Sequence, residues 1–275
     1  MVRLGLALPA HPAAWRQVVA LGQQAEALGW ASLWLPDPGV CGAPAEPGSL
    51  DPLVALAGLA RVTGRARLGT LALDAGLRSP GALANAVATV DRLSGGRVTV
   101  GLAPPDDGPD GTALLGEVLA VLRTVFAGGP LDHAGRFFGL DGLRIDPGPV
   151  QRPGPPLWVV GRSEALLDLA AAAADGWNDG TWVTGPEAYE GSRRADAACR
   201  RAGRDPASLG RSANWLAGGW RGGLAEAVAG WAAVGVTDVV VASGALPFGV
   251  TSTDDIARVA SATELGVRNG KHRSP

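Results

Sequence analysis

The sequence predicts an α/β fold in which eight parallel strands close into a single (β/α)8 barrel, the TIM-barrel architecture. Three observations support this prediction. Short apolar segments alternate with amphipathic helical segments over residues 3–265. The apolar segments are continuous runs rich in Val, Leu and Trp, the pattern of parallel strands buried on both faces. Eight such units in a chain of this length fit a closed barrel, whereas the alternative, a doubly wound open sheet, rarely contains eight.

The predicted elements follow one another with clear boundary signals. Pro52 after Asp51 suits the first turn of a helix, and Gly95-Gly96 mark the end of a later one. The strands are expected at Arg3–Pro9, Ala31–Pro36, Ala66–Leu73, Arg97–Ala103, Leu157–Val160, Gly176–Trp182, Ser212–Ala217 and Thr237–Ala242. The helices are expected at Trp15–Leu28, from Asp51 onward, and at Pro80–Leu93, Ala113–Phe126, Glu164–Ala174, Pro186–Ala202, Leu224–Val234 and Asp254–Leu265.

The alternation of strands and helices indicates one domain. Residues 1–268 are expected to form the barrel, and the polar residues 269–275 a frayed C-terminal tail. The Pro-rich connection over residues 127–156 is interpreted as a loop excursion and not as a domain linker.

Composition excludes several function classes. Of the 275 residues, 18% are charged and 47% hydrophobic, and the net charge is −2, so the chain is globular without the basic run of a nucleic-acid binder. No apolar run reaches the ~18 residues of a membrane span, and the chain enters a strand directly, so a cytoplasmic protein is expected. The distance between Cys41 and Cys199 argues against a disulfide framework, and the scattered His residues argue against a metal site.

The stretch "PPLWVVGRSEALLDLAAAAADGWNDG" places Gly161 between a buried strand and a helix start. A helix N-terminus carries unpaired N–H groups and partial positive charge, and a glycine before it allows a ligand to approach the backbone. Together with Arg162, these features suit an anion. Alternatively, Ser163 is an ordinary N-cap with Glu164 in the first helical turn. The residues alone leave both interpretations open.

Several segments resemble, in order and over nearly the whole chain, the luciferase-like monooxygenase family. The segments are "RLGLALP", "AEALGWASLWLPD", "PVQRPGPPLWVVG" and, most specifically, "RSPGALANAVATVDRLSGGRVTVGL". The resemblance implies a barrel and an oxidoreductase that uses a deazaflavin, coenzyme F420, or FMN. Its substrate would be a small organic molecule that receives hydride or oxygen. The resemblance also implies a homodimer.

The resemblance further implies where the cofactor lies. Its phosphate would bind at Gly161, Arg162 and Ser163, with contributions from Gly180 and Thr181. A non-proline cis peptide beneath the cofactor ring is expected at Leu71–Ala72, which are therefore counted among the cofactor-binding residues.

The sequence departs from the family at the same end of the barrel. Asp37-Pro38 stands where family members often have Asp-His, and proline cannot transfer a proton. The segment "GLAPPDDGPDG" replaces a Gly-rich turn after the fourth strand. The remaining catalytic candidates at strand ends are His11, Asp37 and Asp74, each of which could equally shape a turn. A degenerate barrel without cofactor-dependent turnover is therefore the alternative function.

The aromatic residues in or beside strands have a structural interpretation as well as a functional one. Trp34, Trp158, Trp177 and Trp182 are expected to pack in the core, although one of them could stack on a cofactor ring. His133 lies in a polar loop and is expected to be structural.

Overall fold

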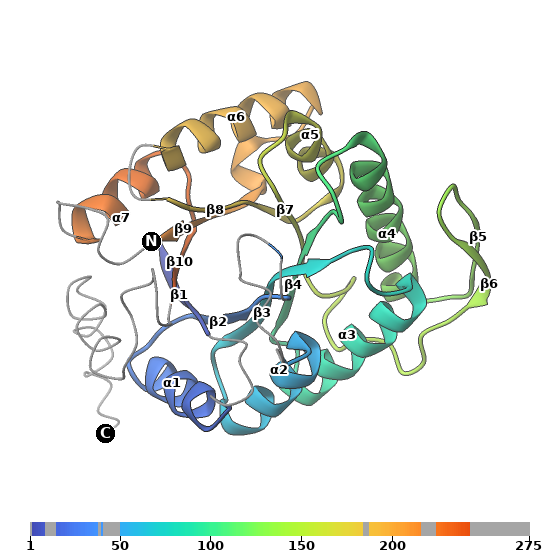
Figure 1. Cartoon of the computed structure of the whole chain (residues 1–275), viewed down its shortest axis with the longest axis horizontal. Coiled ribbons are helices and arrows are strands. Elements are labelled where there is room, and N and C mark those ends of the chain that lie inside the picture. Colours follow the sequence, from blue (N-terminus) through green and yellow to red (C-terminus); the bar gives the residue numbers. More distant parts are fainter. Residues whose placement is uncertain are drawn as a thin grey trace, which may run out of the picture.

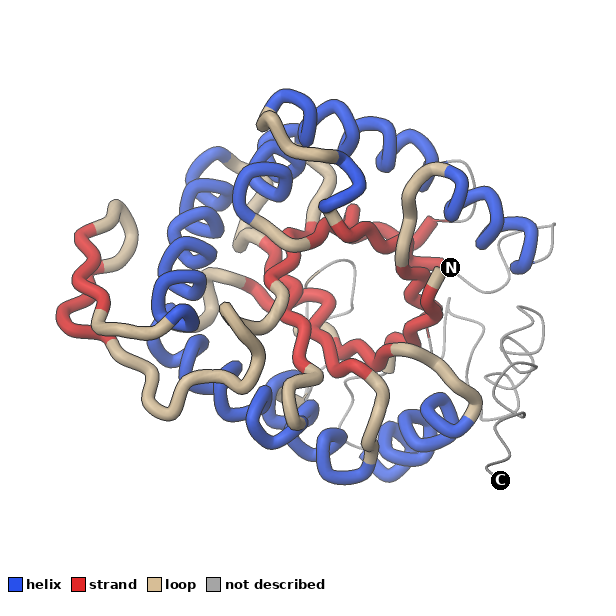
Figure 2. Tube along the Cα trace, turned by 180° about the vertical axis from the view of Figure 1, so that it is seen from behind, coloured by secondary structure: helices blue, strands red, loops and turns tan. Residues whose placement is uncertain are grey.

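The computed structural model describes residues 2–8, 15–37, 40, 50–183, 187–215 and 224–242. Within them, eight parallel strands form a closed barrel (Figures 1 and 2). In order around the ring they are β1 (Arg3–Ala7), β2 (Ser32–Leu35), β3 (Arg67–Asp74), β4 (Val98–Ala103), β7 (Leu157–Val160), β8 (Gly176–Val183), β9 (Gly210–Trp215) and β10 (Asp238–Ala242). The pairing of β1 with β10 closes the ring, so the predicted barrel is confirmed and the open sheet is excluded.

The helices surround the barrel, as the tube in Figure 2 shows. Those in the described ranges are α1 (Trp15–Ala27), α2 (Pro52–Val62), α3 (Pro80–Ser94), α4 (Pro109–Ala127), α5 (Glu164–Ala173), α6 (Glu187–Arg201) and α7 (Leu224–Ala233). None of these helices is long and apolar enough to cross a membrane. The predicted helix at residues 254–265 and the predicted tail at 269–275 lie outside the described residues.

The helix boundaries follow the predicted signals except at α4. Asp51 caps α2, since its Oδ1 accepts the N–H groups of Leu53 and Val54, and Gly95 ends α3 with φ of 68°. The predicted start of α4 at Ala113 is wrong, because the helix begins four residues earlier at Pro109. Proline in the first turn and Asp110 beside the helix N-terminus favour this earlier start.

The excursion between α4 and β7 contains a hairpin that the sequence did not predict. β5 (Leu131–Ala134) and β6 (Gly139–Leu143) pair antiparallel outside α4, as Figure 1 shows. Glu117 of α4 accepts hydrogen bonds from His133 Nε2 at 2.9 Å and from the Phe137 and Phe138 amides. Burial alone would raise the pKa of Glu117, but these hydrogen bonds outweigh it and lower the pKa. His133 therefore has the expected structural role of fixing the hairpin to α4.

Two tryptophans fill the interior of the barrel. Trp34 and Trp158 are buried, with ring centroids 5.9 Å apart. A Cβ added at Gly5 or Gly69 would collide with Trp34, so these glycines on the neighbouring strands leave room for its ring. The barrel is consequently a packed core and not a pore. Core packing of Trp34 and Trp158 agrees with the structural interpretation of the sequence.

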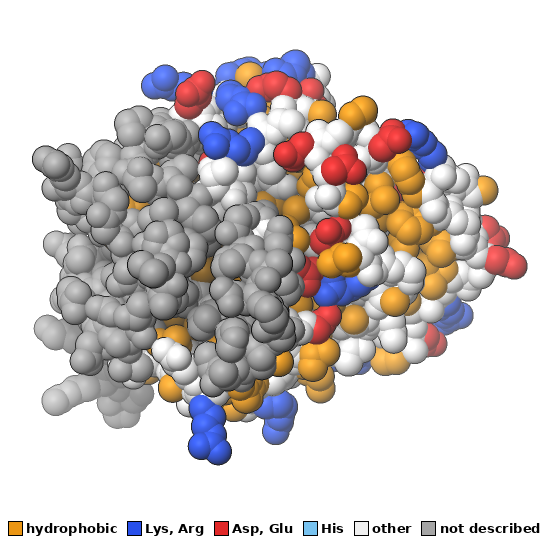
Figure 3. Space-filling model, in the orientation of Figure 1, with side chains coloured by type: hydrophobic (Ala, Val, Ile, Leu, Met, Phe, Trp, Pro, Cys, Tyr) orange, Lys and Arg blue, Asp and Glu red, His pale blue; other side chains and the backbone are white. Residues whose placement is uncertain are grey.

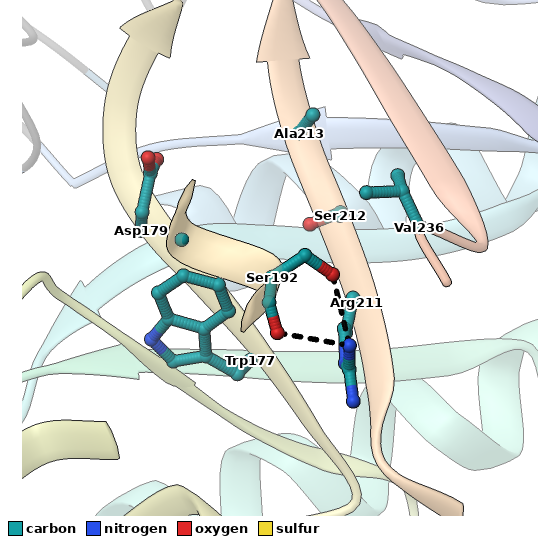
Figure 4. A pocket seen from close by; sticks show the side chains of 8 residues that line it. Trp177, Asp179, Ser192, Arg211, Ser212, Ala213 and Val236 are labelled. Carbon is teal, nitrogen blue, oxygen red and sulfur yellow. Dashed lines mark hydrogen bonds between the residues drawn. The ribbon is translucent and has the colours of Figure 1, made fainter. Parts of the chain in front are cut away.

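A buried arginine fastens α6 to the outside of the barrel next to β8. Arg211 of β9 is only 3% exposed, and its guanidinium donates to Ser192 Oγ at 2.8 Å (Figure 4). It also donates to Asp196 Oδ1 at 2.5 Å. Trp177 of β8 lies beside the Arg211 side chain, and its Nε1–H donates a hydrogen bond to the Gly161 carbonyl. Trp177 is thus also a core residue, and these contacts hold the β8–β9 edge against α6. The side chain of Trp182 lies outside the described part.

The face shown in Figure 3 carries both signs of charge among the residues it colours. Acidic and basic side chains lie close together near its centre, and apolar side chains lie between them and the edge. The largest exposed apolar side chains of the described residues are those of Val54, Leu77, Leu93 and Val150.

Candidate functional site

A cleft of about 610 Å³ lies at the C-terminal ends of β4, β7 and β8. Catalytic and binding residues of (β/α)8 barrels sit at this end because the loops that follow the strands converge there. The cleft brings together six of the residues singled out from the sequence: Asp74, Gly161, Arg162, Ser163, Gly180 and Thr181. It is therefore the candidate functional site.

The floor of the cleft at Ala103 and Val160 is apolar and belongs to a cluster that includes the residues of the expected cis peptide. The Leu71–Ala72 bond is cis, as predicted. Both residues pack in a small apolar cluster with Ala103, Val160 and Trp34, among others. Because Ala103 and Val160 also line the cleft, this cluster forms a continuous apolar surface beneath it. Such a surface can take one face of a planar ring.

Asp37 is buried beside the cleft in an ion pair and is not among the residues that line it. Asp37 as a residue is 1% exposed, and its carboxylate accepts hydrogen bonds from Arg78 Nη1 at 2.6 Å, Arg78 Nη2 at 2.9 Å and the Asp74 N–H at 3.0 Å. Its own N–H donates to the Ala72 carbonyl. These contacts join the ends of β2 and β3. The catalytic role expected of Asp37 stays a prediction.

The partner of Asp37 makes a second ion pair. Arg78 Nη2 also lies 2.7 Å from Oδ2 of Asp51, the residue that caps α2. The hydrogen bond with Asp37, followed by the one with Asp51, raises the pKa of Arg78, which stays charged. The chain Asp37–Arg78–Asp51 thereby fixes the loops on this side of the cleft.

Of the two other catalytic candidates, Asp74 lies within the described residues and His11 does not. Asp74 lines the cleft, and its Oδ1 accepts the Gly76 N–H at 2.7 Å, so it shapes the turn after β3 while facing the ligand space. His11 lies outside the described residues, as does Pro38.

The strand-to-helix turn after β7 confirms the N-cap interpretation of the sequence, and the anion site stays a prediction. Ser163 is the N-cap of α5, and its Oγ accepts the Leu166 N–H at 3.3 Å. Gly161 has φ of 146°, and the space where its Cβ would lie is filled by Leu166. Leu166 and backbone conformation, and not only a ligand, therefore demand this glycine. Arg162 between them is exposed and lines the cleft.

Glu164 is held away from Arg162 by two arginines of α6. Arg194 Nε donates to Glu164 Oε1 at 2.7 Å, and Arg201 Nη2 donates to Oε2 at 3.2 Å. The hydrogen bond from Arg194, the largest effect, lowers the pKa of Glu164. Arg194 also donates to the Arg162 carbonyl. The carboxylate in the first turn of α5 is thus neutralised by α6, and Arg162 is left facing the cleft.

The irregular segment within β8, where its register with β9 shifts between Asn178 and Trp182, satisfies its amides with its own side chains. Gly180, with φ of 76°, donates its N–H to Asn178 Oδ1 at 2.8 Å, and Thr181 donates its N–H to Asp179 Oδ1 at 2.9 Å. Asn178 is anchored in turn by buried hydrogen bonds to Asn214 and Ser212 of β9. The Thr181 Oγ1 atom, by contrast, is buried and has no hydrogen-bond partner among the residues that the structure describes. It is therefore available to a ligand at this end of the cleft.

Sequence reasoning missed several residues of this cleft. Asp179 and Asn178 occur in "GWNDG", where polar residues interrupt an apolar strand just before its end, a signal that was available but not used. Asp106 and Asp107 lie in the segment that was recognised only as a departure from the family pattern. All three aspartates line the cleft.

The fold and the site define a (β/α)8 barrel with a ligand cleft at its C-terminal mouth, built over a cis peptide. A model of the luciferase-like monooxygenase family matches residues 2–216. The protein belongs to the luciferase-like monooxygenase family.

Solved structures share this fold at low sequence identity. The chain is similar to a coenzyme F420-dependent tetrahydromethanopterin reductase from Methanopyrus kandleri, with a TM-score of 0.79 and 16% identity over 95% of this chain and 98% of that one. For a monooxygenase from Streptomyces bottropensis, the TM-score is 0.69 and the sequence identity 21%, over 95% of this chain and 97% of that one. For a riboflavin lyase with modified FMN and riboflavin, the TM-score is 0.65 and the sequence identity 18%, over 85% of this chain and 66% of that one. None of these neighbours supports the alternative of a barrel without turnover.

Proposed function

We propose that the protein is an oxidoreductase that binds coenzyme F420 or FMN in the mouth cleft. It would transfer hydride to a small organic substrate or oxygenate it. The observation that carries the proposal is the juxtaposition, within one cleft, of an apolar floor at Ala103 and Val160 and a polar corner at Arg162. A cofactor with a flat ring and a phosphate needs both surfaces.

The residues present fit such a group. Ala103 and Val160 offer an apolar face to a ring, and the N-terminus of α5 with Arg162 offers a site for one phosphate. The Thr181 Oγ1 atom, which has no partner among the described residues, supplies a further hydroxyl from β8, the strand next to β7. When bound, the cofactor supplies the redox chemistry, and the protein supplies binding, orientation and a dry surface.

The contacts around the cleft restrict which of the described acidic side chains can transfer a proton. Asp37 is committed to Arg78, so Asp74 is the acidic residue among the sequence candidates that faces the cleft. We therefore propose that Asp74 transfers protons to or from a ligand in the cleft. Asp37, in this proposal, positions the ends of the strands.

Cofactor titration tests the proposal. We expect FMN or coenzyme F420 to bind the purified protein with a saturable change in fluorescence. In the Arg162→Ala variant the affinity should fall about tenfold, because one charge-assisted contact contributes about 1.5–3 kcal/mol. Arg144→Ala is the matched control, since the Arg144 side chain directly after β6 is 65% exposed and pairs only weakly with Asp146 at 3.6 Å. Equal affinities for Arg162→Ala and wild type would refute the anchor, and no binding of either cofactor would refute the function.

We also propose that the protein acts in the cytoplasm as a homodimer without nucleic-acid or membrane partners. Exposed Val54 on α2 and Leu93 on α3 support the dimer, since they place apolar side chains on neighbouring helices. Light scattering at micromolar concentration tests it, and a mass near the 27.8 kDa of one chain would contradict it.

A further inference from the structure

One residue, Asn178, holds both strands that form the polar corner of the cleft. Its main-chain carbonyl accepts the Gly161 N–H at 2.9 Å, which ties it to the end of β7. Its side-chain Oδ1 accepts the Gly180 N–H at 2.8 Å, within the irregular segment of β8. Gly161, Gly180 and Thr181 line the cleft, whereas Asn178 is 0% exposed and does not line it. Asn178 can therefore affect a ligand only through the residues that it holds.

The orientation of the Asn178 amide is fixed by its partners. The Gly180 N–H can only donate, so it must face Oδ1, whereas the Ser212 carbonyl, 3.3 Å from Nδ2, can only accept. Asn214 of β9 forms a reciprocal pair with this amide. Its Oδ1 accepts from Asn178 Nδ2 at 2.8 Å, and its own Nδ2 donates to Asn178 Oδ1 at 3.0 Å. Turning the amide over would place donor against donor, so the buried network permits one orientation.

The position of Asn178 Oδ1 in turn determines where Thr181 lies. The hydrogen bond from the Gly180 N–H to a side chain two residues earlier closes a tight turn directly before Thr181. Gly180 has φ of 76°, a left-handed conformation that this turn requires. The Thr181 Oγ1 atom that follows is buried and has no partner among the described residues. A buried hydroxyl in this state is a group that a ligand can satisfy.

We propose that Asn178 is a positioning residue whose amide places the Thr181 hydroxyl relative to Arg162, so that both donors bind the same cofactor phosphate. This inference rests on the proposed function, because it concerns the phosphate of the proposed cofactor. The main-chain carbonyl of Asn178 holds the turn before Arg162, and its amide oxygen holds the turn before Thr181. Donors fixed in advance on two strands bind an anion without the cost of ordering them.

The first test compares two ligands that differ only in the phosphate. The ratio of the riboflavin Kd to the FMN Kd measures the contribution of the phosphate. In Asn178→Leu, which keeps the approximate shape of the side chain but removes the Oδ1 acceptor, we expect this ratio to fall about tenfold. Thr70→Val is the matched control, since Thr70 Oγ1 accepts the buried Gly101 N–H at 3.0 Å between β3 and β4. It removes a hydrogen bond of the same kind away from the polar corner, so the ratio should change less than about twofold.

A double-mutant cycle separates positioning from general destabilisation. Thr181→Val alone should lower the ratio about tenfold, because it removes the hydroxyl itself. In the Thr181→Val background, Asn178→Leu should change the ratio less than about twofold, because it acts through that hydroxyl. Additive effects of the two substitutions, or an unchanged ratio in Asn178→Leu, would overturn the inference. Asn178→Ala, which leaves room for water, takes the place of Asn178→Leu if the latter does not fold.

Inorganic phosphate gives a readout that does not need the flavin ring. Titrated during thermal unfolding, it should raise the Tm of wild type and of Thr70→Val more than that of Asn178→Leu. This pattern without binding of FMN or coenzyme F420 would refute the proposed function and leave the role of Asn178 intact. Phosphate shifts of equal size in wild type and Asn178→Leu, or a wild type that responds to neither phosphate nor FMN, would overturn that role.

Discussion

The ion pair of Asp37 and Arg78 is the feature whose perturbation separates a structural from a catalytic role most sharply. In Asp37→Asn the side chain keeps its shape but loses its charge. In wild type, Arg78 Nη2 donates to the carboxylate at 2.9 Å. If the amide oxygen of the variant still accepts hydrogen bonds from the Asp74 N–H and Arg78 Nη1, its new NH2 group faces Arg78 Nη2. Two donors then oppose each other in a site that is 1% exposed at residue 37.

The expected loss of stability follows from these contacts. Removing one partner of a buried ion pair costs about 3–5 kcal/mol. Arg78 is 20% exposed and keeps Asp51 at 2.7 Å, which reduces the penalty. We therefore expect the free energy of unfolding to fall by about 2–4 kcal/mol, and the Tm by roughly 5–15 °C. Urea and thermal unfolding, followed by circular dichroism, measure both quantities.

The control is Asp74→Asn, which removes the other acidic candidate at the same end of the barrel. The Asp74 side chain accepts only the exposed Gly76 N–H among the described contacts, so its loss should cost less than about 1 kcal/mol. The reasoning is refuted if Asp37→Asn unfolds within about 0.5 kcal/mol of wild type. Loss of turnover together with unchanged stability would instead identify Asp37 as a proton-transferring group.

Two further predictions concern residues whose contacts are equally well defined. Burial alone would raise the pKa of Glu26, but hydrogen bonds from the amides of residues 64–66 outweigh burial and lower this pKa from its ordinary value of 4.5. The stability that the carboxylate contributes is therefore fully present above pH 4.5 and is lost as the pH falls through the lowered pKa. Glu26→Gln should therefore be less stable than wild type by about 1 kcal/mol at pH 7, with the gap in urea unfolding closing in acid. Gly161→Ala should cost about 3 kcal/mol or more, since φ is 146° and Leu166 fills the space of the new Cβ. Gly203→Ala, at φ of 68° with open space, should cost only about 1–2 kcal/mol, and equal losses would contradict the role of Leu166.

The sequence predicted the barrel because its information is local and repeated. Each apolar run and each cap, such as Asp51 before Pro52, carries its own signal, and eight repetitions compensate for small errors in any one of them. The β5–β6 hairpin was missed because its strands are short and half-exposed, without alternating apolar residues, and because Glu117, which holds it, lies on a different element. Long-range partners of this kind leave no local pattern.

The site was predicted only in part for the same reason. Gly161, Arg162 and Ser163 are adjacent in sequence, so their meeting at the cleft was visible in one short stretch. The pairing of Asp37 with Arg78 spans 41 residues, and nothing near Asp37 in the sequence indicates that its carboxylate is already occupied. Resemblance to a family located the cis peptide at Leu71–Ala72, which residue-level reasoning alone would not have found.

The polar groups around the cleft point to one principle of its construction. Where the barrel ends, backbone amides and charged side chains would remain unpaired unless the chain or a ligand satisfied them. The chain satisfies Gly180 and Thr181 with its own Asn178 and Asp179. It draws Glu164 away through α6, and it leaves Arg162 open to the cleft. Each internal contact removes a competing position for an anion, so the contacts that stabilise the barrel mouth also restrict where a charged ligand can bind.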